Sequence, residues 1–221
     1  MIIEDCKMIK VALFDLDGVV FDTEPQYTIF WGDICREFRP DLPGLEHQIK
    51  GQTLIQIYDK YFSGLKDVQT VITCRLNEYE KRMEYRYIAG LEDFLKDLKH
   101  NGVHTAVVTS SNLEKMECVY AQHPEFSALF DRILTAEDFS KSKPDPDCYL
   151  KGARAFDEEV AHCVGFEDSF NGLKAVRAAG MFTVGLSTTN SAEDIASYAD
   201  YVMSDYTDID YSKLVELAHL S

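Results

Sequence analysis

The sequence predicts an α/β protein in which a parallel β-sheet is combined with an inserted, all-helical segment. Three observations predict this class. Short apolar runs of strand length alternate with helical patterns along most of the chain. These runs are nearly continuous, which indicates strands that are buried on both faces of a sheet. Residues 24–87, by contrast, carry helical patterns only. Alternating strands and helices form parallel βαβ units with right-handed crossovers, so we expect an open parallel sheet covered by helices.

The strands are expected at six apolar runs. The first lies within residues 8–14, where the run M-I-K-V-A-L-F ends abruptly at D-L-D-G. A short apolar run that stops at carboxylates and a glycine is typical of a buried strand followed by a turn. The other five runs are residues 104–108, 132–134, 163–166, 182–186 and, with a weaker pattern, 201–203.

Capping residues mark the helices between these strands. Residues 90–100 carry leucine and phenylalanine on one helical face and end at Asn101-Gly102. Asp145 followed by Pro146 predicts an N-cap and a first helical residue, because the missing N–H of proline costs nothing at that position. Two further helices are expected over residues 169–179, closed by Gly180, and after the capping box of Ser191 and Asp194.

The segment between the first two strands breaks this rhythm. Its apolar residues recur at helical spacing in three groups without a strand pattern between them. We therefore expect residues 23–87 to form a helical domain of their own, and residues 1–22 with 88–221 to form the sheet domain. The three groups are Tyr27, Phe30, Trp31, Ile34 and Phe38; Leu54, Tyr58, Tyr61, Phe62 and Leu65; and Val68, Val71, Ile72, Leu76, Tyr79 and Met83.

Composition limits the possible partners. The chain has 221 residues, with Lys+Arg 22 against Asp+Glu 38 and a formal net charge of −16. This excess of negative charge repels a phosphate backbone and an anionic membrane, so neither nucleic acid nor membrane is an expected partner. Glu4, Asp5, Lys7 and Lys10 interrupt any signal-peptide core, so we expect a cytoplasmic protein. A monomer is the default expectation.

Cysteine and histidine spacing indicates neither a disulfide framework nor a zinc site. The chain has no C-x-x-C pair, so we expect buried free thiols. His100 and His104 have the spacing of a metal-binding pair, but Asn101-Gly102 predicts a helix end between them, and we expect both to face solvent. The six cysteines are Cys6, Cys35, Cys74, Cys118, Cys148 and Cys163.

Polar side chains come directly after three of the expected strands, and one lysine lies in a nearby loop. Ligands of an open parallel sheet bind beyond the carboxyl ends of its strands, so we expect these side chains to converge. They are Asp15 and Asp17 after the first strand; Thr109, Ser110 and Ser111 after the second; Glu167 and Asp168 after the fourth; and Lys143 in S-K-S-K-P-D-P.

This set of residues predicts phosphoryl transfer. Carboxylates that converge repel one another and need a cation, and oxygen ligands without histidine or cysteine favour Mg²⁺. A magnesium ion beside a lysine and hydroxyl donors is complementary to a phosphoryl group. Asp15 and Asp17 could divide the chemistry, one attacking phosphorus and the other exchanging a proton with the leaving group and water. The expected substrate is a small phosphate ester.

With these residues the sequence resembles the haloacid dehalogenase superfamily, specifically its phosphatase and β-phosphoglucomutase-like branch. Four motifs occur in order, namely D-L-D-G-V-V, T-S-S, K-P-D-P-D-x-Y and G-F-E-D-S-F-N-G. The resemblance covers the whole chain and implies a Rossmann-like core with a helical cap inserted after the first motif. It implies a Mg²⁺-dependent phosphatase that acts on a small phosphate monoester, with a sugar phosphate as the expected class.

The resemblance also implies roles for individual residues. Asp15 would be the nucleophile that forms an aspartyl-phosphate, and Asp17 the general acid and then the general base. Thr109 and the Ser110 backbone would bind the transferring phosphoryl group, and Lys143 would bridge it to Asp15.

The same resemblance implies a set of metal ligands. Asp15, Asp168 and the backbone carbonyl of Asp17 would bind Mg²⁺, and Glu167 would support them from behind. Gly18 would let the backbone pass close to the site.

Three other functions can be weighed against this one. A haloalkanoic acid dehalogenase would use Asp15 without a metal, but such enzymes lack a second aspartate at the position of Asp17. A response-regulator receiver also phosphorylates an aspartate near a hydroxyl and a lysine, but its acidic pair precedes the phospho-acceptor strand and it has no cap. A catalytically silent binding protein would not need every residue that the mechanism requires.

The alternative within the branch is a phosphosugar mutase. β-Phosphoglucomutases carry a histidine and an arginine in the cap, and Tyr27 and Leu54 stand at those places here. Without this cationic clamp a second phosphate would be held poorly, so hydrolysis is the favoured outcome. We expect the cap to select the substrate through residues around Glu24, Gln26, Tyr27, Lys50 and Gln52.

Overall fold

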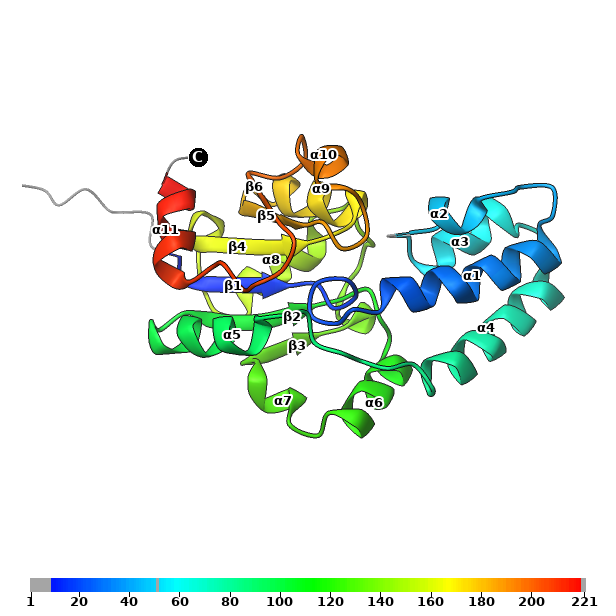
Figure 1. Ribbon diagram of the computed structural model, residues 1–221, viewed down its shortest axis with the longest axis horizontal. Helices are drawn as coiled ribbons and strands as arrows, with labels where there is room; N and C mark the ends of the chain where they lie inside the picture. Colours follow the sequence, from blue (N-terminus) through cyan, green and yellow to red (C-terminus); the bar gives the residue numbers. More distant parts are fainter. Residues whose placement is uncertain (1–8, 51, 220–221) are drawn as a thin grey trace, which may run out of the picture.

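The computed structural model describes residues 9–50 and 52–219, and Cys6 and the beginning of the first expected strand lie outside this part. The described chain contains a six-stranded parallel sheet with the order β3-β2-β1-β4-β5-β6, which confirms the predicted sheet (Figure 1). Val11 of the central strand is paired with His104 on one side and Cys163 on the other. The strands are β1 (Val11–Phe14), β2 (His104–Val108), β3 (Arg132–Leu134), β4 (Cys163–Glu167), β5 (Phe182–Leu186) and β6 (Tyr201–Met203).

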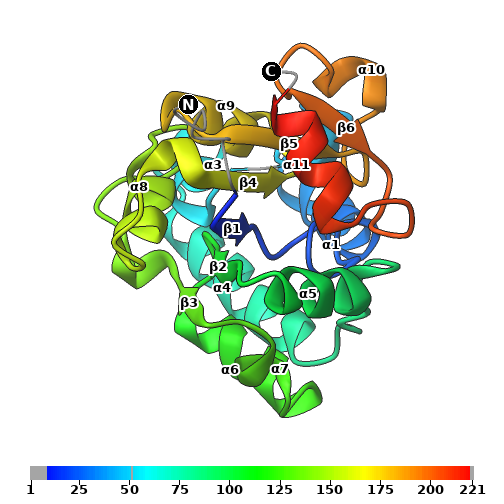
Figure 2. The ribbon, with the colours of Figure 1, turned by 90° about the vertical axis from the view of Figure 1, so that its left-hand side faces the viewer.

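Helices cover both faces of the sheet (Figure 2). On one face α5, α6, α7 and α11 enclose an apolar cluster in which the Phe14 and Phe166 rings stack with centroids 4.5 Å apart. On the other face α8 and α9 pack on Val11 and Leu13. These helices, together with α10, are α5 (Leu91–His100), α6 (Leu113–Gln122), α7 (Phe126–Leu129), α8 (Asp147–Arg154), α9 (Phe170–Ala178), α10 (Ala192–Ile195) and α11 (Tyr211–His219). Two 3₁₀ turns, η1 (Ala136–Asp138) and η2 (Val160–His162), lie in the connections.

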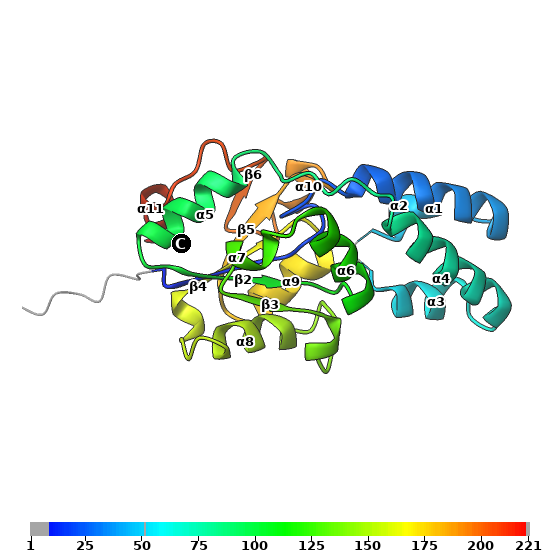
Figure 3. The ribbon, with the colours of Figure 1, turned by 90° about the horizontal axis from the view of Figure 1, so that it is seen from below.

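Four helices between β1 and β2 form a separate group beyond the carboxyl ends of the strands (Figures 1 and 3). They have an apolar cluster of their own, in which Trp31, Ile34, Phe62 and Ile72 are buried. No strand occurs among the described residues between 24 and 80. The helices are α1 (Glu24–Phe38), α2 (Leu45–Gln48), α3 (Leu54–Tyr61) and α4 (Lys66–Glu80). None of the helices in the described chain has the length and apolar character needed to cross a membrane.

Two local expectations need correction. The expected burial of the cysteines is wrong for Cys74, which is exposed on α4. Helix α8 begins at Asp147 rather than at Pro146, although the Asp145 carboxylate still accepts a hydrogen bond from the Asp147 N–H at 3.1 Å.

Two glycines at the ends of α5 provide a matched test of backbone packing. Gly90 and Gly102 have φ values of +79° and +74°, so alanine at either position adopts a left-handed conformation that costs about 1 kcal/mol. A Cβ at Gly90 would lie 2.6 Å from the Tyr206 carbonyl carbon, whereas no described atom lies within 4 Å of a Cβ at Gly102. We expect Gly90→Ala to lower the free energy of unfolding by about 2 kcal/mol more than Gly102→Ala. Urea denaturation measures both, and equal losses would contradict the packing account.

Candidate functional site

A cavity of about 600 Å³ lies where the carboxyl ends of the strands face α1, α3 and α4. In an open parallel sheet this edge is the place where ligands bind. Most of the candidate residues line the cavity, and Glu167 lies behind it with no solvent exposure. The lining includes Asp15, Asp17, Glu24, Tyr27, Lys50, Gln52, Thr109, Ser110, Ser111, Lys143 and Asp168.

The ammonium group of Lys143 lies between carboxylates from the ends of β1 and β4. Its ammonium group donates hydrogen bonds to Asp15 Oδ1 at 2.7 Å, to Glu167 Oε1 at 2.6 Å and to the Val108 carbonyl at 3.2 Å. The side chain is only 7% exposed. Burial by itself would lower the pKa of Lys143, but the carboxylates of Asp15 and Glu167 raise it above its ordinary value, so the lysine is charged. Asp15 is the first residue after β1, and its own pKa is raised by burial despite the neighbouring ammonium group.

Glu167 is held by donors on both of its carboxylate oxygens. Oε1 accepts the Lys143 bond and a bond from the Tyr149 hydroxyl at 2.8 Å. Oε2 accepts bonds from the Asp168 N–H at 3.2 Å and the Ser169 hydroxyl at 3.2 Å. A Cβ at Gly172 would lie 1.9 Å from this carboxylate, so the helix α9 needs glycine where it passes Glu167. These contacts make Glu167 a support for Lys143 and for the loop after β4.

Three carboxylates offer ligand atoms within 4.8 Å of one another, those of Asp15, Glu167 and Asp168. Both oxygens of Glu167 accept hydrogen bonds, whereas Lys143 binds one oxygen of Asp15 and Thr189 binds one oxygen of Asp168. The second oxygens of Asp15 and Asp168 are therefore the better candidates to face a cation. Burial and the nearby charge of Glu24 raise the pKa of Asp168 well above its ordinary value. A Cβ at Gly18, whose φ is +70°, would lie 2.0 Å from Asp168 Oδ2. The backbone after β1 therefore passes closely over a set of oxygen ligands that fits a hard divalent cation.

Asp17 lies two residues beyond Asp15 and is fixed by three side chains. Its Oδ1 accepts a hydrogen bond from the Thr23 hydroxyl at 2.6 Å, and its Oδ2 accepts one from the Ser111 hydroxyl at 3.2 Å. The ammonium group of Lys115 also donates to Oδ2 and forms an ion pair with it. The carboxylate remains 21% exposed, so it is accessible from the cavity.

The T-S-S segment lies directly after β2. Thr109 is buried, its backbone N–H donates to the Leu134 carbonyl at 3.0 Å, and its hydroxyl accepts a bond from the Ser111 N–H at 3.0 Å. Ser110 is exposed, while both residues line the cavity beside the carboxylates. The turn thus places hydroxyl groups at the sheet edge, beside the carboxylates.

The side of the cavity formed by the helices is acidic. Among the described residues, Oε2 of Glu24 is the one buried side-chain polar atom without a hydrogen-bond partner, and the Lys50 ammonium lies 3.8 Å from it. Burial and the charge of Asp17 raise the pKa of Glu24. The Tyr27 hydroxyl donates to Glu80 at 2.8 Å.

Gln26 does not belong with the residues that line the cavity. Its side-chain amide donates to the Glu84 carbonyl at 2.8 Å and accepts from the Glu84 N–H at 3.0 Å. Gln26 is one of the positions around which we expect substrate selection, but its own side chain is bound to Glu84 and does not line the cavity.

Sequence patterns missed several residues that hold the site. Thr189 and Asn190 lie in the loop after β5 and contact Asp168, and the Thr188 hydroxyl donates to the Gly18 carbonyl at 2.5 Å. Their position after a strand was a signal that could have identified them, since β5 ends at the same edge of the sheet. Lys115 had no such signal, because it lies on α6 rather than directly after a strand.

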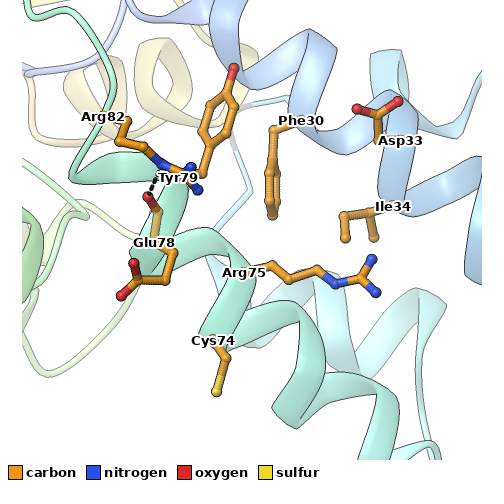
Figure 4. A pocket seen from close by; sticks show the side chains of 8 residues that line it. All are labelled: Phe30, Asp33, Ile34, Cys74, Arg75, Glu78, Tyr79 and Arg82. Carbon is orange, nitrogen blue, oxygen red and sulfur yellow. Dashed lines mark hydrogen bonds between the residues drawn. The ribbon is translucent and has the colours of Figure 1, made fainter.

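A second hollow lies outside this site. It has a volume of about 420 Å³ and is formed by α1 and α4, with Phe30, Ile34 and Arg75 in its lining (Figure 4). The Arg75 guanidinium is paired with Glu37 at 2.5 Å. None of the clustered carboxylates or the lysine at the sheet edge borders it.

The chain is similar to curated phosphatases and to a mutase. It is 28% identical to validoxylamine A 7'-phosphate phosphatase of Streptomyces hygroscopicus subsp. limoneus, over 91% of this chain and 96% of that protein. It is also 28% identical to β-phosphoglucomutase of Bacillus subtilis, over 80% of this chain and 83% of that protein.

Solved structures share the fold. A HAD hydrolase of family IA, variant 3, from Entamoeba histolytica superposes with a TM-score of 0.82 at 21% identity, over 95% of this chain and 99% of that one. β-Phosphoglucomutase from Clostridium difficile superposes with a TM-score of 0.79 at 23% identity, over 96% of this chain and 98% of that one.

The family model for haloacid dehalogenase-like hydrolases matches residues 9–180, which is well over half of the chain. This match includes β1 to β4, the four inserted helices and every carboxylate of the cluster. The chain belongs to the haloacid dehalogenase-like hydrolase family.

Proposed function

We propose that the protein is a Mg²⁺-dependent phosphatase that hydrolyses a small phosphate monoester, with a sugar phosphate as the substrate class, through an aspartyl-phosphate on Asp15. One observation carries the proposal. The carboxylates of Asp15 and Asp168 lie together beside the Lys143 ammonium, and the accessible Asp17 carboxylate borders the same cavity. A phosphoryl group bound there would meet a nucleophile, cationic groups and a proton donor.

The reaction would proceed in two displacements on Asp15. An Asp15 carboxylate oxygen attacks phosphorus, the bond from phosphorus to the leaving-group oxygen breaks, and protonated Asp17 gives its proton to that oxygen. Asp17 then takes a proton from water as the water oxygen attacks phosphorus. The bond between Asp15 and phosphorus breaks, and inorganic phosphate leaves. Both steps use the same two aspartates, which lie on one turn after β1.

The other residues of the sheet edge would hold the phosphoryl group. Lys143, already 2.7 Å from Asp15, would bridge the nucleophile to a phosphoryl oxygen, and Glu167 would keep the ammonium in place. Thr109 and the Ser110 N–H would donate to the remaining oxygens. This arrangement stabilises the negative charge that is spread over the phosphoryl group during transfer.

The proposed metal ligands are the carboxylates of Asp15 and Asp168 and the backbone carbonyl of Asp17. A magnesium ion bound there would supply positive charge to the phosphoryl oxygens. The raised pKa values of Asp15 and Asp168 support this assignment, because two buried carboxylates cannot both ionise at low cost without a cation between them.

We also propose that residues 23–87 form a cap domain over a core of residues 1–22 and 88–221. The two segments that connect them lie side by side, since the Asp22 N–H donates to the Arg86 carbonyl at 2.8 Å and Phe21 is bridged to Tyr87. The Gln56 side chain of α3 donates to the Lys143 carbonyl at 3.1 Å and so connects the inserted helices to the core. A domain that is joined to its neighbour by two adjacent connecting segments can open as a unit and close to exclude water.

The charges on the cap favour hydrolysis over the mutase alternative. Tyr27 and Leu54 line the cavity without contributing a cation, and Lys50 lies next to the Glu24 carboxylate. The unpartnered Glu24 oxygen is suited to accept a bond from a substrate hydroxyl, whereas it would repel a second phosphate. Relatives named as phosphatases also support hydrolysis, whereas the similarity to β-phosphoglucomutase of Bacillus subtilis supports the mutase alternative.

Asn substitutions separate the two aspartates. Asp15→Asn removes the nucleophile while keeping its shape, so we expect turnover to disappear from a folded protein. Asp17→Asn keeps the nucleophile and should lower the rate by about 10²-fold or more, because the leaving group and the water lose their proton partner. Steady-state phosphate release on a panel of sugar phosphates measures both. More than a few per cent of wild-type turnover in Asp15→Asn would contradict the mechanism.

Metal removal should affect both activity and stability. EDTA should abolish activity and Mg²⁺ should restore it, while Ca²⁺ should not, because it takes longer bonds and more ligands. Carboxyl groups whose pKa is raised by folding favour the folded state below about pH 4 and lose that contribution as the pH rises. Mg²⁺ relieves the repulsion between ionised carboxylates. At saturating Mg²⁺ we therefore expect the rise in melting temperature to be larger at pH 8 than at pH 5, by about 5 °C or more.

Asp168→Asn is the control for this metal effect. The variant should lose the Mg²⁺-dependent shift at pH 8 while it melts at or above the temperature of the metal-free wild type. Thermal denaturation with and without EDTA measures the shift. An identical shift in the variant would remove Asp168 from the ligands.

Product analysis distinguishes the phosphatase from the mutase. With β-glucose 1-phosphate primed by glucose 1,6-bisphosphate, we expect phosphate release to exceed glucose 6-phosphate formation, or no reaction if glucose is the wrong sugar. Dominant glucose 6-phosphate would support the mutase and would make Lys50 the cation that holds the second phosphate. In that case Lys50→Ala should abolish the mutase reaction and leave acetyl phosphate hydrolysis nearly unchanged, since the latter needs only the core.

A further inference from the structure

Lys115 is a buried lysine for which the proposed mechanism has no role. It lies in the first turn of α6, where the Asn112 side chain accepts a hydrogen bond from its backbone N–H at 3.0 Å. Its side chain is 5% exposed, and its ammonium group donates to Asp17 Oδ2. The same ammonium group lies 4.8 Å from the centre of the Tyr27 ring. A lysine is rarely this buried unless its charge is paired, so the contact with Asp17 accounts for its position.

Each of the two aspartates after β1 therefore has its own lysine. Lys143 contacts Asp15, and Lys115 contacts Asp17. Within the described chain, Asp17 is the one hydrogen-bond acceptor of the Lys115 ammonium group, although that group has three N–H donors. Lys115 also lines the cavity. Its remaining donors are thus available to an oxygen of a ligand bound beside Asp17.

Lys115 also connects the core to the helical cap. The Tyr27 ring over which its charge lies belongs to α1, and the Tyr27 hydroxyl is bound to Glu80 of α4. A cation held against an aromatic face is attracted by the ring, more strongly where water is excluded. One ammonium group thus contacts the loop after β1 and the helices on the other side of the cavity.

We propose that Lys115 is a positioning residue for proton transfer, which holds the Asp17 carboxylate toward the leaving-group oxygen and ties that geometry to the closed cap through Tyr27. This inference rests on the proposed phosphatase function. Thr23 and Ser111 hold Asp17 from the core. Without Lys115, Oδ2 would keep only the 3.2 Å bond from Ser111, and the carboxylate could turn away from the leaving group.

The proposal has a signature that a structural role lacks. Proton donation matters for a substrate whose leaving group is a poor one, such as an alkyl alcohol, and matters little for p-nitrophenol, which leaves as a stable anion. Loss of a positioned acid should therefore lower kcat/KM for an alkyl phosphate much more than for p-nitrophenyl phosphate. A general fault in folding or in phosphoryl binding would lower both by the same factor.

The experiment compares Lys115→Met, Lys115→Arg and wild type on p-nitrophenyl phosphate and on the best alkyl phosphate of the sugar phosphate panel. Methionine keeps an apolar stem of similar size without the charge. We expect Lys115→Met to lower kcat/KM on the alkyl phosphate by roughly 10-fold to 100-fold, a part of what a general acid contributes. On p-nitrophenyl phosphate the loss should stay below about threefold. Lys115→Arg should recover most of the alkyl phosphate activity, because it restores a cation beside Asp17.

Lys174→Met is the control for the loss of a lysine over an aromatic ring, since the exposed Lys174 lies over the Tyr198 ring at 5.3 Å and does not border the cavity. It should leave both substrates unchanged. Equal losses of Lys115→Met on both substrates, or no loss on either, would overturn the inference while Asp15→Asn still tests the phosphatase itself. If Lys115→Met does not fold, Lys115→Gln replaces it: a larger loss on the alkyl phosphate than on p-nitrophenyl phosphate supports the inference, and equal losses reject it.

Discussion

Lys143 carries a positive charge in the interior of the protein, and the arrangement of the site depends on how that charge is neutralised. Asp15 comes from the end of β1 and Glu167 from the end of β4, and both contact the same ammonium group. Removing one partner from a buried ion pair costs about 3–5 kcal/mol, because a charge is left without compensation. Tyr149 of α8 also contacts Glu167, so one cation joins two central strands, a long loop and a helix.

The carboxylates around this lysine indicate how a protein of net charge −16 could bind an anion, because they would hold a cation beside it. The carboxylates of Asp15, Glu167 and Asp168 lie within 4.8 Å of one another, and the nearby lysine cannot neutralise all of them. A divalent cation would complete the balance and reverse the sign of the local field. Burial raises the pKa values of Asp15 and Asp168, and the neighbouring carboxylates add to the shift, so a metal ion bound there would compete with protons for one set of oxygens.

In the proposed mechanism, the sheet edge and the inserted helices would contact different parts of the substrate. Groups that would contact the phosphoryl group come from strand ends and, in the case of Lys143, from the loop before α8. Groups that would contact the leaving group come from α1, α3 and α4, which pack around an apolar cluster separate from those of the sheet. Asp17 and Lys115 lie where the two parts meet, and Tyr27 joins them.

The sequence by itself determined the parallel sheet, the helical insert and the residues after β1, β2 and β4, because strand-length apolar runs and the polar residues that end them are local signals. It did not determine which of those residues hold one another. Three features depend on residues far apart in the chain. They are the donors to Glu167, the contacts of Thr189 with Asp168 and of Lys115 with Asp17, and the hydrogen bonds that hold Gln26 against Glu84. Only the tertiary structure decided them, since side-chain direction and burial depend on packing between elements rather than on spacing within one.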